Sequence, residues 1–341
     1  MPVFLLSLLG CSVVQGLLGD PSKQVADAEA KLKSGDLAGA SAVYDEAMKK
    51  APTNVDVASG AAYVKLLQGN PAAADTILAA TEATAGARLP EVKMRRALVA
   101  LKTGDLDQVK TFASAAATPE GKLLVAEVIL ADGGDRASEK AALEGVQGEA
   151  GVVGDTAKGY LSLLNDPDPK IAGLAEVDAL WALGQRPIAV RAVEELVLAY
   201  AGSREDGAEQ LLLWAGRAAT VGEPQIATNL LDAIPVPPAG QAWRVQATRA
   251  MVACAEGNGG ECYGGFTKIS AISPADGYAD ARATAALLIA EKDAETAKKL
   301  LEGQNGDAAA RAWALLGDAQ SAGTVAADPV FKAQFAPGAG G

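Results

Sequence analysis

The stretch LKSGDLAGASAVYDEAMKKAP, residues 32–52, decides how this chain folds. Its turn SGD (34–36) separates two helix-forming runs: Gly35 can adopt the left-handed conformation that ends a helix, and Asp36 can cap the next one. Ala40 and Tyr44, four residues apart after the turn, share one face of the second helix. The stretch therefore predicts a helical hairpin in which a small and then a bulky side chain face the neighbouring helix.

The same kind of turn recurs along the chain. Six further strings pair a glycine with a following polar residue: QGN (68–70), TGD (103–105), LGQ (183–185), VGE (221–223), EGN (256–258) and LGD (316–318). Successive glycines lie 34 and 35 residues apart from Gly35 to Gly104, and 38 and 35 apart from Gly184 to Gly257. A further step of 35 falls on Lys292, where the turn glycine is missing, and Gly317 follows 25 residues later. A period of this length indicates stacked helical hairpins.

Side-chain size repeats in the same frame. Small residues stand seven positions before each turn: Ala28, Ala62, Ala97, Val177, Ala215, Ala250, Ala285 and Ala310. Others stand five positions after it: Ala40, Ala74, Val109, Ala189, Ala227, Cys262, Ala297 and Ala322. Mostly larger residues stand nine positions after it: Tyr44, Leu78, Ala113, Val193, Leu231, Phe266, Leu301 and Ala326. Small side chains let helices approach closely, so the three columns predict the packing faces of each hairpin.

The pattern resembles the tetratricopeptide repeat, a helix–turn–helix unit of about 34 residues. The resemblance covers 21–117 and 170–327, although the large aromatic that the family carries early in its first helix is generally missing. The first unit matches best, with family positions at Ala28, Gly35, Asp36, Leu37, Ala40, Tyr44, Ala47 and Pro52. The resemblance implies an all-α, TPR-like α-solenoid, a right-handed superhelix of helical hairpins that binds other proteins through a concave groove.

Residues 118–169 depart from the repeat frame. Within them, 119–147 predict a hairpin that turns at ADGGD (131–135), and 152–164 predict a single helix. The string NDPDP (165–169) ends that helix, because each proline lacks a backbone donor and restricts the residue before it. We expect an irregular helical joint at 118–169 between repeats at 21–117 and 170–335, and a disordered tail at 336–341.

Residues 1–20 predict a signal peptide or a hydrophobic N-terminal segment. The uncharged run VFLLSLLGCSVVQGLLG (3–19) is short for a membrane span. Its segment LLGC (8–11) resembles the lipobox of bacterial lipoproteins, which implies cleavage before Cys11 and lipidation of that cysteine; Ser12 resembles an outer-membrane sorting signal. A signal peptide requires a basic stretch before its apolar run. No Lys or Arg precedes the run here, so a plain hydrophobic segment is the alternative.

The cysteine count bears on the compartment. Lipidation of Cys11 leaves Cys254 and Cys262 as a pair. A disulfide between them suits an oxidising envelope compartment, and closing a loop of about nine residues contributes roughly 2.5 kcal/mol. The alternative is that both are small buried thiols of a cytosolic protein.

Composition argues against catalysis and against nucleic-acid binding. The chain has no histidine, the usual general base and the commonest metal ligand, and we find no phosphate-binding loop, dinucleotide fingerprint or nucleophile elbow. A net charge of −12 opposes nucleic acid, and the basic cluster at 93–96 is expected to be a solvated helix face. We expect no enzymatic activity, no cofactor, no metal and no nucleic-acid partner.

Candidate contact residues follow from the repeat frame. The family implies exposed positions on first helices at or near Arg95, Arg244, Arg282 and Arg311, where they meet acidic side chains or a terminal carboxylate; ordinary surface arginines are the alternative. Trp243 opens its helix and is a further candidate, whereas the remaining tryptophans belong to apolar rows and are expected in the core: Trp181, Trp214 and Trp313.

Three functions remain open from the sequence. The leading one is a non-enzymatic scaffold, an outer-membrane lipoprotein facing the periplasm that holds a subunit of a larger machine for outer-membrane assembly, secretion or pilus biogenesis. The second is a superhelical cell-wall enzyme that uses carboxylates. The third is a cytosolic adaptor or co-chaperone with reduced cysteines.

Overall fold

The computed structural model describes residues 21–270, 277–328 and Lys332. Within these residues every regular element is helical, and apart from one short 3-10 helix, η1 Gly86–Arg88, all are α-helices. They are α1 Pro21–Lys33, α2 Leu37–Lys50, α3 Val55–Leu67, α4 Pro71–Glu82, α5 Leu89–Thr103, α6 Leu106–Ala116, α7 Pro119–Ala131, α8 Arg136–Glu144, α9 Val152–Leu164, α10 Pro169–Ala182, α11 Arg186–Ala201, α12 Gly207–Thr220, α13 Pro224–Asp232, α14 Ala242–Glu256, α15 Gly259–Ser270, α16 Tyr278–Ile289, α17 Ala294–Leu301, α18 Asp307–Leu315 and α19 Ala319–Val325.

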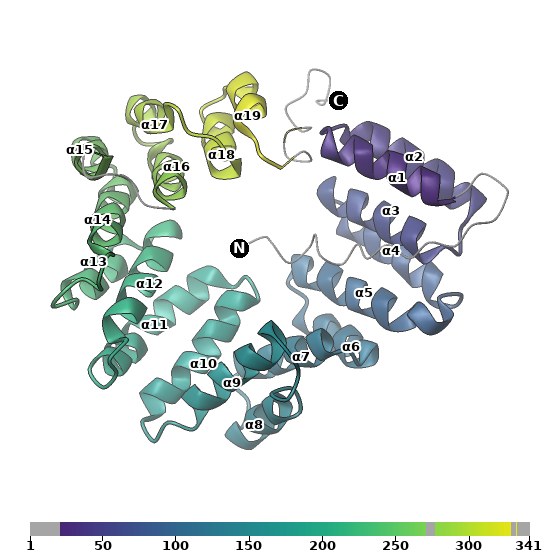
Figure 1. Ribbon diagram of the computed structural model, residues 1–341, viewed down its shortest axis with the longest axis horizontal. Coiled ribbons are helices and arrows are strands. Elements are labelled where there is room, and N and C mark those ends of the chain that lie inside the picture. The colour runs from purple at the N-terminus through teal and green to yellow at the C-terminus, as the bar shows by residue number, and fades with distance from the viewer. Residues whose placement is uncertain (1–20, 271–276, 329–331, 333–341) are drawn as a thin grey trace.

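Consecutive helices pair as hairpins, from α1–α2 to α18–α19, and the hairpins stack side by side. The stack follows a ring-like path, in which α18–α19 returns toward α1–α2 (Figure 1). Helices α12, α14 and α16 lie on its inner side, and α13, α15 and α17 on its outer side. This arrangement is the TPR-like α-solenoid that the sequence predicted.

All seven predicted turn glycines adopt the left-handed conformation, with φ between 73° and 85°. The residue after the glycine then caps the next helix where its side chain is short: Asp36 Oδ1 accepts a hydrogen bond from the Gly39 amide at 2.7 Å. The same bond forms at Asn70, Asp105, Asn258 and Asp318. The longer Gln185 and Glu223 make no such bond. The sequence motif therefore corresponds to a helix stop followed by a helix start.

The turn at Lys292 works without a left-handed residue. Among the described residues that are not glycine, only Ala117 has positive φ, so the chain between α16 and α17 turns in ordinary conformations. Asp293 still caps α17, accepting from the Thr296 amide at 3.0 Å. Lys292 Nζ meanwhile donates to the carbonyl of Ala255 at the end of α14. In place of the turn glycine, the chain has a lysine whose side chain donates a hydrogen bond to a carbonyl of the neighbouring hairpin.

The predicted columns form the core. Every residue seven positions before a turn is at most 3% exposed, and every residue five positions after it is fully buried. The column nine positions after the turn is buried as well, except for Ala326. The core is therefore a series of thin layers between successive hairpins, each buried by its neighbours.

The chain between 118 and 169 keeps the stack continuous. Helix α7 packs directly against α10, while α8 and α9 make an additional excursion between them. Helix α9 spans the range expected for it, and α10 begins at Pro169, capped by Asp168, whose Oδ1 accepts from the Lys170 amide at 2.8 Å.

Toward the C-terminal end the inner helices pack directly on one another. Helix α14 contacts α16, and α16 contacts α18. Both contacts are more extensive than those of the outer helices, α15 with α16 and α17 with α18. Buried alanines on all three inner helices belong to one continuous core: Ala247, Ala250, Ala253, Ala283, Ala285, Ala286, Ala309 and Ala312. Small side chains allow this close approach.

Helix α15 has little intrinsic tendency to be helical. Four of its 12 residues are glycine, and each glycine is about 0.5–1 kcal/mol less favourable than alanine inside a helix. The helix is held by its surroundings: Cys262, Phe266 and Ile269 are buried, and the Tyr278 hydroxyl of α16 donates to the Phe266 carbonyl at 2.8 Å.

Candidate interaction surface

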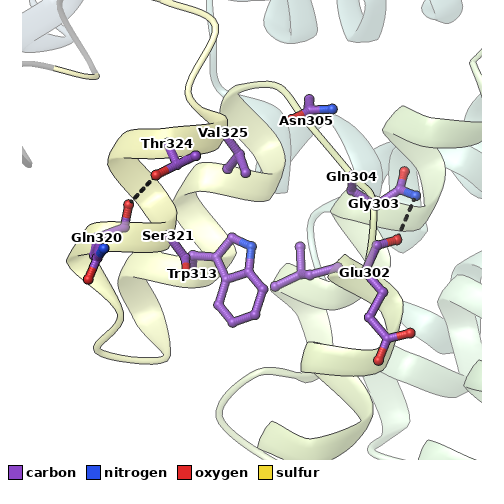
Figure 2. Close-up of a pocket in the computed structure, with 10 residues that line it drawn as sticks. Glu302, Gly303, Gln304, Asn305, Trp313, Gln320, Ser321, Thr324 and Val325 are labelled. Atoms are coloured by element: carbon purple, nitrogen blue, oxygen red, sulfur yellow. Dashed lines mark hydrogen bonds between the residues drawn. The ribbon is translucent and has the colours of Figure 1, made fainter.

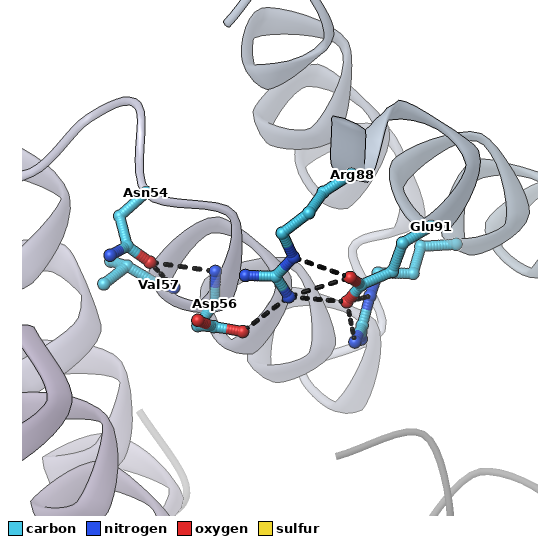
Figure 3. Close-up of polar contacts among 6 residues, drawn as sticks. Asn54, Asp56, Val57, Arg88 and Glu91 are labelled. Atoms are coloured by element: carbon cyan, nitrogen blue, oxygen red, sulfur yellow. Dashed lines mark hydrogen bonds and ion pairs between the residues drawn. The ribbon is translucent and has the colours of Figure 1, made fainter. Parts of the chain in front are cut away.

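An ion-pair network joins α3 to α5 (Figure 3). Asn54 caps α3 and fixes its first turn, accepting from the Asp56 amide at 2.9 Å. Arg88 then bridges the two hairpins, with Nη2 2.7 Å from Asp56 Oδ1 and Nε 2.9 Å from Glu91 Oε2. The other oxygen of Glu91 accepts from Arg95 Nη2 at 2.8 Å. Arg95, predicted to meet a partner, is therefore engaged within the chain, and its side chain is only 17% exposed.

The basic cluster at 93–96 is not a solvated helix face, and that expectation was wrong. Arg96 lies between α4 and α5, with Nε 2.6 Å from Asp75 Oδ1 and Nη1 2.7 Å from Glu82 Oε1. Lys93 Nζ lies 2.6 Å from the other oxygen of Glu82. The Arg96 guanidinium also stacks over Phe112, 4.0 Å from the ring centre. Carboxylates on the preceding helix thus neutralise Lys93 and Arg96, while Arg95 pairs with Glu91 of its own helix.

Two tryptophans and an arginine join α10 to α12. Trp181 and Trp214 meet edge to face with ring centres 5.9 Å apart, and the Arg217 guanidinium lies 4.8 Å and 4.2 Å from those two centres. Arg217 Nη1 also pairs with Asp178 Oδ1 at 2.8 Å. Cation–π contacts of this kind contribute about 0.5–2 kcal/mol each. Trp214 is buried as expected, whereas Trp181 is partly buried.

The same region contains a carboxyl group that no basic residue pairs with in any described contact. Glu127 of α7 accepts a 3.4 Å hydrogen bond from the Tyr160 hydroxyl of α9, and burial raises the pKa of Glu127 to about 7. Burial and the charges of Glu127 and Asp178 raise the pKa of Tyr160 as well. Burial likewise raises the pKa of Asp178, against the lowering effect of Arg217. Sequence reasoning missed this group. The sequence has a signal only for Asp178, which directly follows Val177 of the small-residue column, because Glu127 and Tyr160 lie outside the repeat frame.

Two shallow pockets lie elsewhere on the surface. The first, of about 340 Å³, lies between the end of α17 and the hairpin α18–α19, with Trp313 as one wall and Glu302 on the connecting loop (Figure 2). The second, of about 530 Å³, lies along α14 and α15 and contains Glu261. Each has a single carboxylate among its lining residues, so neither has the carboxylate pair that glycoside hydrolysis requires.

The remaining predicted contact residues lie on three successive inner helices. Arg244 of α14 is exposed and bonds to Gln241 Oε1 at 2.8 Å. Arg282 of α16 donates to the Lys299 carbonyl at 2.8 Å, and Arg311 of α18 is exposed. Trp243 is partly buried against the core, so it is less available than its place at the start of α14 indicated.

Two of the three cysteines lie within the described residues. Cys254 and Cys262 form a disulfide across the turn between α14 and α15, with Cα atoms 4.9 Å apart, and both residues are fully buried. Cys11, the predicted lipidation site, lies outside the described residues.

The two ends of the array approach one another. Asp307, at the start of α18, accepts hydrogen bonds from the amides of Ala327 and Asp328 at 3.0 Å and 2.8 Å. Residues 326–328, directly after α19, lead from there toward the side of the first hairpins (Figure 1). Burial, together with the charge of Asp328, raises the pKa of Tyr63 on α3.

The described residues contain neither a cluster of metal ligands nor a helix that could span a membrane. No group of three or more Cys, Asp or Glu side chains there is arranged to hold a metal ion. None of the helices in 21–270 and 277–328 has both the length and the apolar character needed to cross a bilayer.

Comparison with known proteins gives one family. Residues 31–100 match the tetratricopeptide repeat family, and no curated protein sequence matches the chain. Among solved structures, the chain is similar to the "P58(IPK) TPR Domain" at 16% identity, over 92% of this chain and 97% of that one, with a TM-score of 0.24. The matched span runs from the end of α1 to α5, and the buried columns continue from α10 to α19, with left-handed turn glycines at 184, 222, 257 and 317. Residues 31–100 are therefore tetratricopeptide repeats, and the described residues that follow continue the same TPR-like α-solenoid.

Proposed function

We propose that this protein is a scaffold of the bacterial envelope, anchored by lipid on Cys11, whose inner helices hold a protein subunit of a larger complex. The observation that supports binding is the architecture itself: thin hairpin layers follow one another without a central core, and repeats of this family are interaction modules. A stack of this kind presents a long curved surface, along which a partner segment contacts several hairpins in turn.

The partner we propose is an acidic segment. Arg244, Arg282 and Arg311 stand on three successive inner helices of a chain whose net charge is −12. We propose that Arg244 and Arg311 bring positive charge to one stretch of the concave groove, where a carboxylate of the partner gains charge-assisted hydrogen bonds. Arg282 lies between them and adds its charge, while its guanidinium donates to the Lys299 carbonyl of α17. The predominantly acidic remainder of the surface directs such a segment to this stretch.

Affinity purification from native membranes tests the binding surface. The native chain is compared with Arg244→Ala and with Arg191→Ala, a control on α11, outside the proposed stretch, whose side chain is 71% exposed. We expect Arg244→Ala to reduce recovery of the co-purified protein several-fold and Arg191→Ala to leave it unchanged. Equal recovery with all three chains contradicts the proposed surface.

The anchor and the compartment are tested separately. Cells that express the chain with its native N-terminus are given a labelled fatty acid, with Cys11→Ala as the control. We expect label on the native chain only, in the outer-membrane fraction, and a native mass two hydrogens below that of the reduced form. A cytosolic adaptor instead stays unlabelled with free thiols. The two pockets described above do not favour a carboxylate-dependent cell-wall enzyme, since each is lined by a single carboxylate.

A further inference from the structure

Helix α15 combines the least helix-favouring composition in the array with the disulfide of the chain. We infer that α15 becomes stably folded only once Cys254 and Cys262 are joined, so that oxidation is the step that completes the hairpin α14–α15. The inference is independent of the proposed partner and of the lipid anchor.

The sequence of α15 opposes a helix. Besides its four glycines, it contains Tyr263, Phe266, Thr267 and Ile269, which are aromatic or β-branched and lose side-chain freedom in a helix. It contains no alanine or leucine. A segment of 12 residues with this composition is far below the length and propensity at which helices persist alone. The helix therefore depends on tertiary contacts.

Two of the glycines are required by packing. A Cβ atom on Gly265 would lie 2.7 Å from the Cβ of Ala250, where α15 crosses α14. A Cβ atom on Gly259 would lie 2.2 Å from Asp293 Oδ2, at the cap of α17. A larger residue at Gly265 would require α14 to shift, and one at Gly259 would displace the Asp293 side chain that caps α17.

The other two glycines have no packing role in the structure. A Cβ atom on Gly264 would meet nothing within 4 Å, and one on Gly260 would meet only Asn258 Oδ1 at 3.9 Å. Alanine fits at both positions, yet the chain has glycine, which lowers the stability of the helix without a gain in contact. This excess flexibility makes α15 sensitive to the bond at Cys262.

The disulfide supplies the missing constraint. It ties Cys262 in the first half of α15 to Cys254 near the end of α14. Forming it removes two protons and two electrons from the two thiols, and a disulfide-bonded oxidant accepts them and becomes a dithiol. Because both cysteines are fully buried in the hairpin, the bond resists reductants while α15 is folded. The reduced chain loses this constraint, and α15 then opens locally, together with its side of the 530 Å³ pocket against α14.

Hydrogen–deuterium exchange of the full chain tests the inference. The native protein is compared with Cys254→Ala/Cys262→Ala, and deuterium uptake is followed in peptides from 259–270, with α5 and α6 as an internal reference. We expect protection in α15 to fall on the order of 10- to 100-fold in the double variant, the range that loss of the loop constraint implies, while α5 and α6 remain unchanged.

A rescue distinguishes weak helix propensity from general damage. Adding Gly260→Ala and Gly264→Ala to the cysteine-free chain should restore most of the protection, because both side chains enter open space. Adding Gly265→Ala instead should not, because its methyl group collides with Ala250. Undiminished protection in the cysteine-free chain overturns the inference. So does a loss that spreads through α12–α18 and is not restored by the two alanines, since the bond would then hold the core rather than α15.

Discussion

Replacing Gly104 by alanine and Ala117 by glycine perturbs the left-handed ends of α5 and α6 in opposite directions. Gly104 ends α5 at φ 74°, and a Cβ atom there would meet nothing within 4 Å. Ala117 ends α6 at φ 55° and is the single residue other than glycine with positive φ in the described chain. Both substitutions therefore change backbone preference without changing packing.

The expected size follows from two opposing contributions. The left-handed conformation costs an alanine about 1–2 kcal/mol, while glycine loses roughly 0.5–1 kcal/mol more conformational entropy on folding. Gly104→Ala should therefore destabilise the folded chain by about 0.5–1 kcal/mol, and Ala117→Gly should stabilise it by a similar amount.

Urea unfolding followed by circular dichroism measures both changes. A repeat array need not unfold in a single step, so exchange protection of the α5 and α6 amides is measured alongside. Gly104→Asn serves as a control that should lose less stability than Gly104→Ala, because asparagine tolerates the left-handed region. If Ala117→Gly lowered stability, or if Gly104→Ala left it unchanged, the assignment of these turns as left-handed helix ends would be refuted.

Three further predictions concern packing and charge. Gly60→Ala places a methyl group 2.2 Å from the Tyr44 ring and should lower the unfolding free energy by about 1–3 kcal/mol. In a chain that also has Tyr44→Leu, Gly60→Ala should be less costly, because the ring is gone. An equal cost of Gly60→Ala with and without Tyr44→Leu contradicts the contact. Trp214→Ala should cost about 3–5 kcal/mol because that side chain is 1% exposed, and a loss below about 1 kcal/mol in urea unfolding contradicts its place in the core. Burial raises the pKa of Glu127 from 4.5 to about 7, so the folded chain is less stable when this carboxyl is ionised. The stability that the protonated carboxyl contributes is fully present below pH 4.5 and is lost as the pH rises through about 7. Glu127→Gln should therefore be more stable than the native chain at about pH 8, with the advantage gone at about pH 4, and urea midpoints that differ equally at both pH values contradict this.

The hairpins were predictable from sequence because the information for them is local. A glycine that ends one helix and an Asp or Asn that caps the next lie side by side in the chain, and the small residues of the packing faces keep fixed distances from them. The short step of 25 residues before Gly317 also has a local explanation, since α17 has 8 residues and α18 has 9.

Contacts between hairpins were not predictable in the same way. The carboxylates that neutralise Arg96 belong to α4, 14 and 21 residues away, and Arg217 meets Asp178 across 39 residues. Which side chains meet at such separations depends on how far each hairpin rotates relative to the last, and the period of the sequence does not contain that angle. For the same reason, the direct packing of α14 on α16, and the burial of Glu127 beside Tyr160, had no counterpart in the expectations.

A deletion of one whole period tests the architecture most directly. Removing 70–104 takes out α4 and α5 and rejoins Gly69 to Asp105, which restores a glycine–aspartate turn between α3 and α6. If each hairpin is stabilised by its neighbours, the shortened chain should keep the same helical signal per residue and still unfold cooperatively in urea, whereas removing only 70–87 should disrupt it. Loss of folded structure in the whole-period deletion, to the same extent as in the half-period deletion, would contradict the repeat architecture.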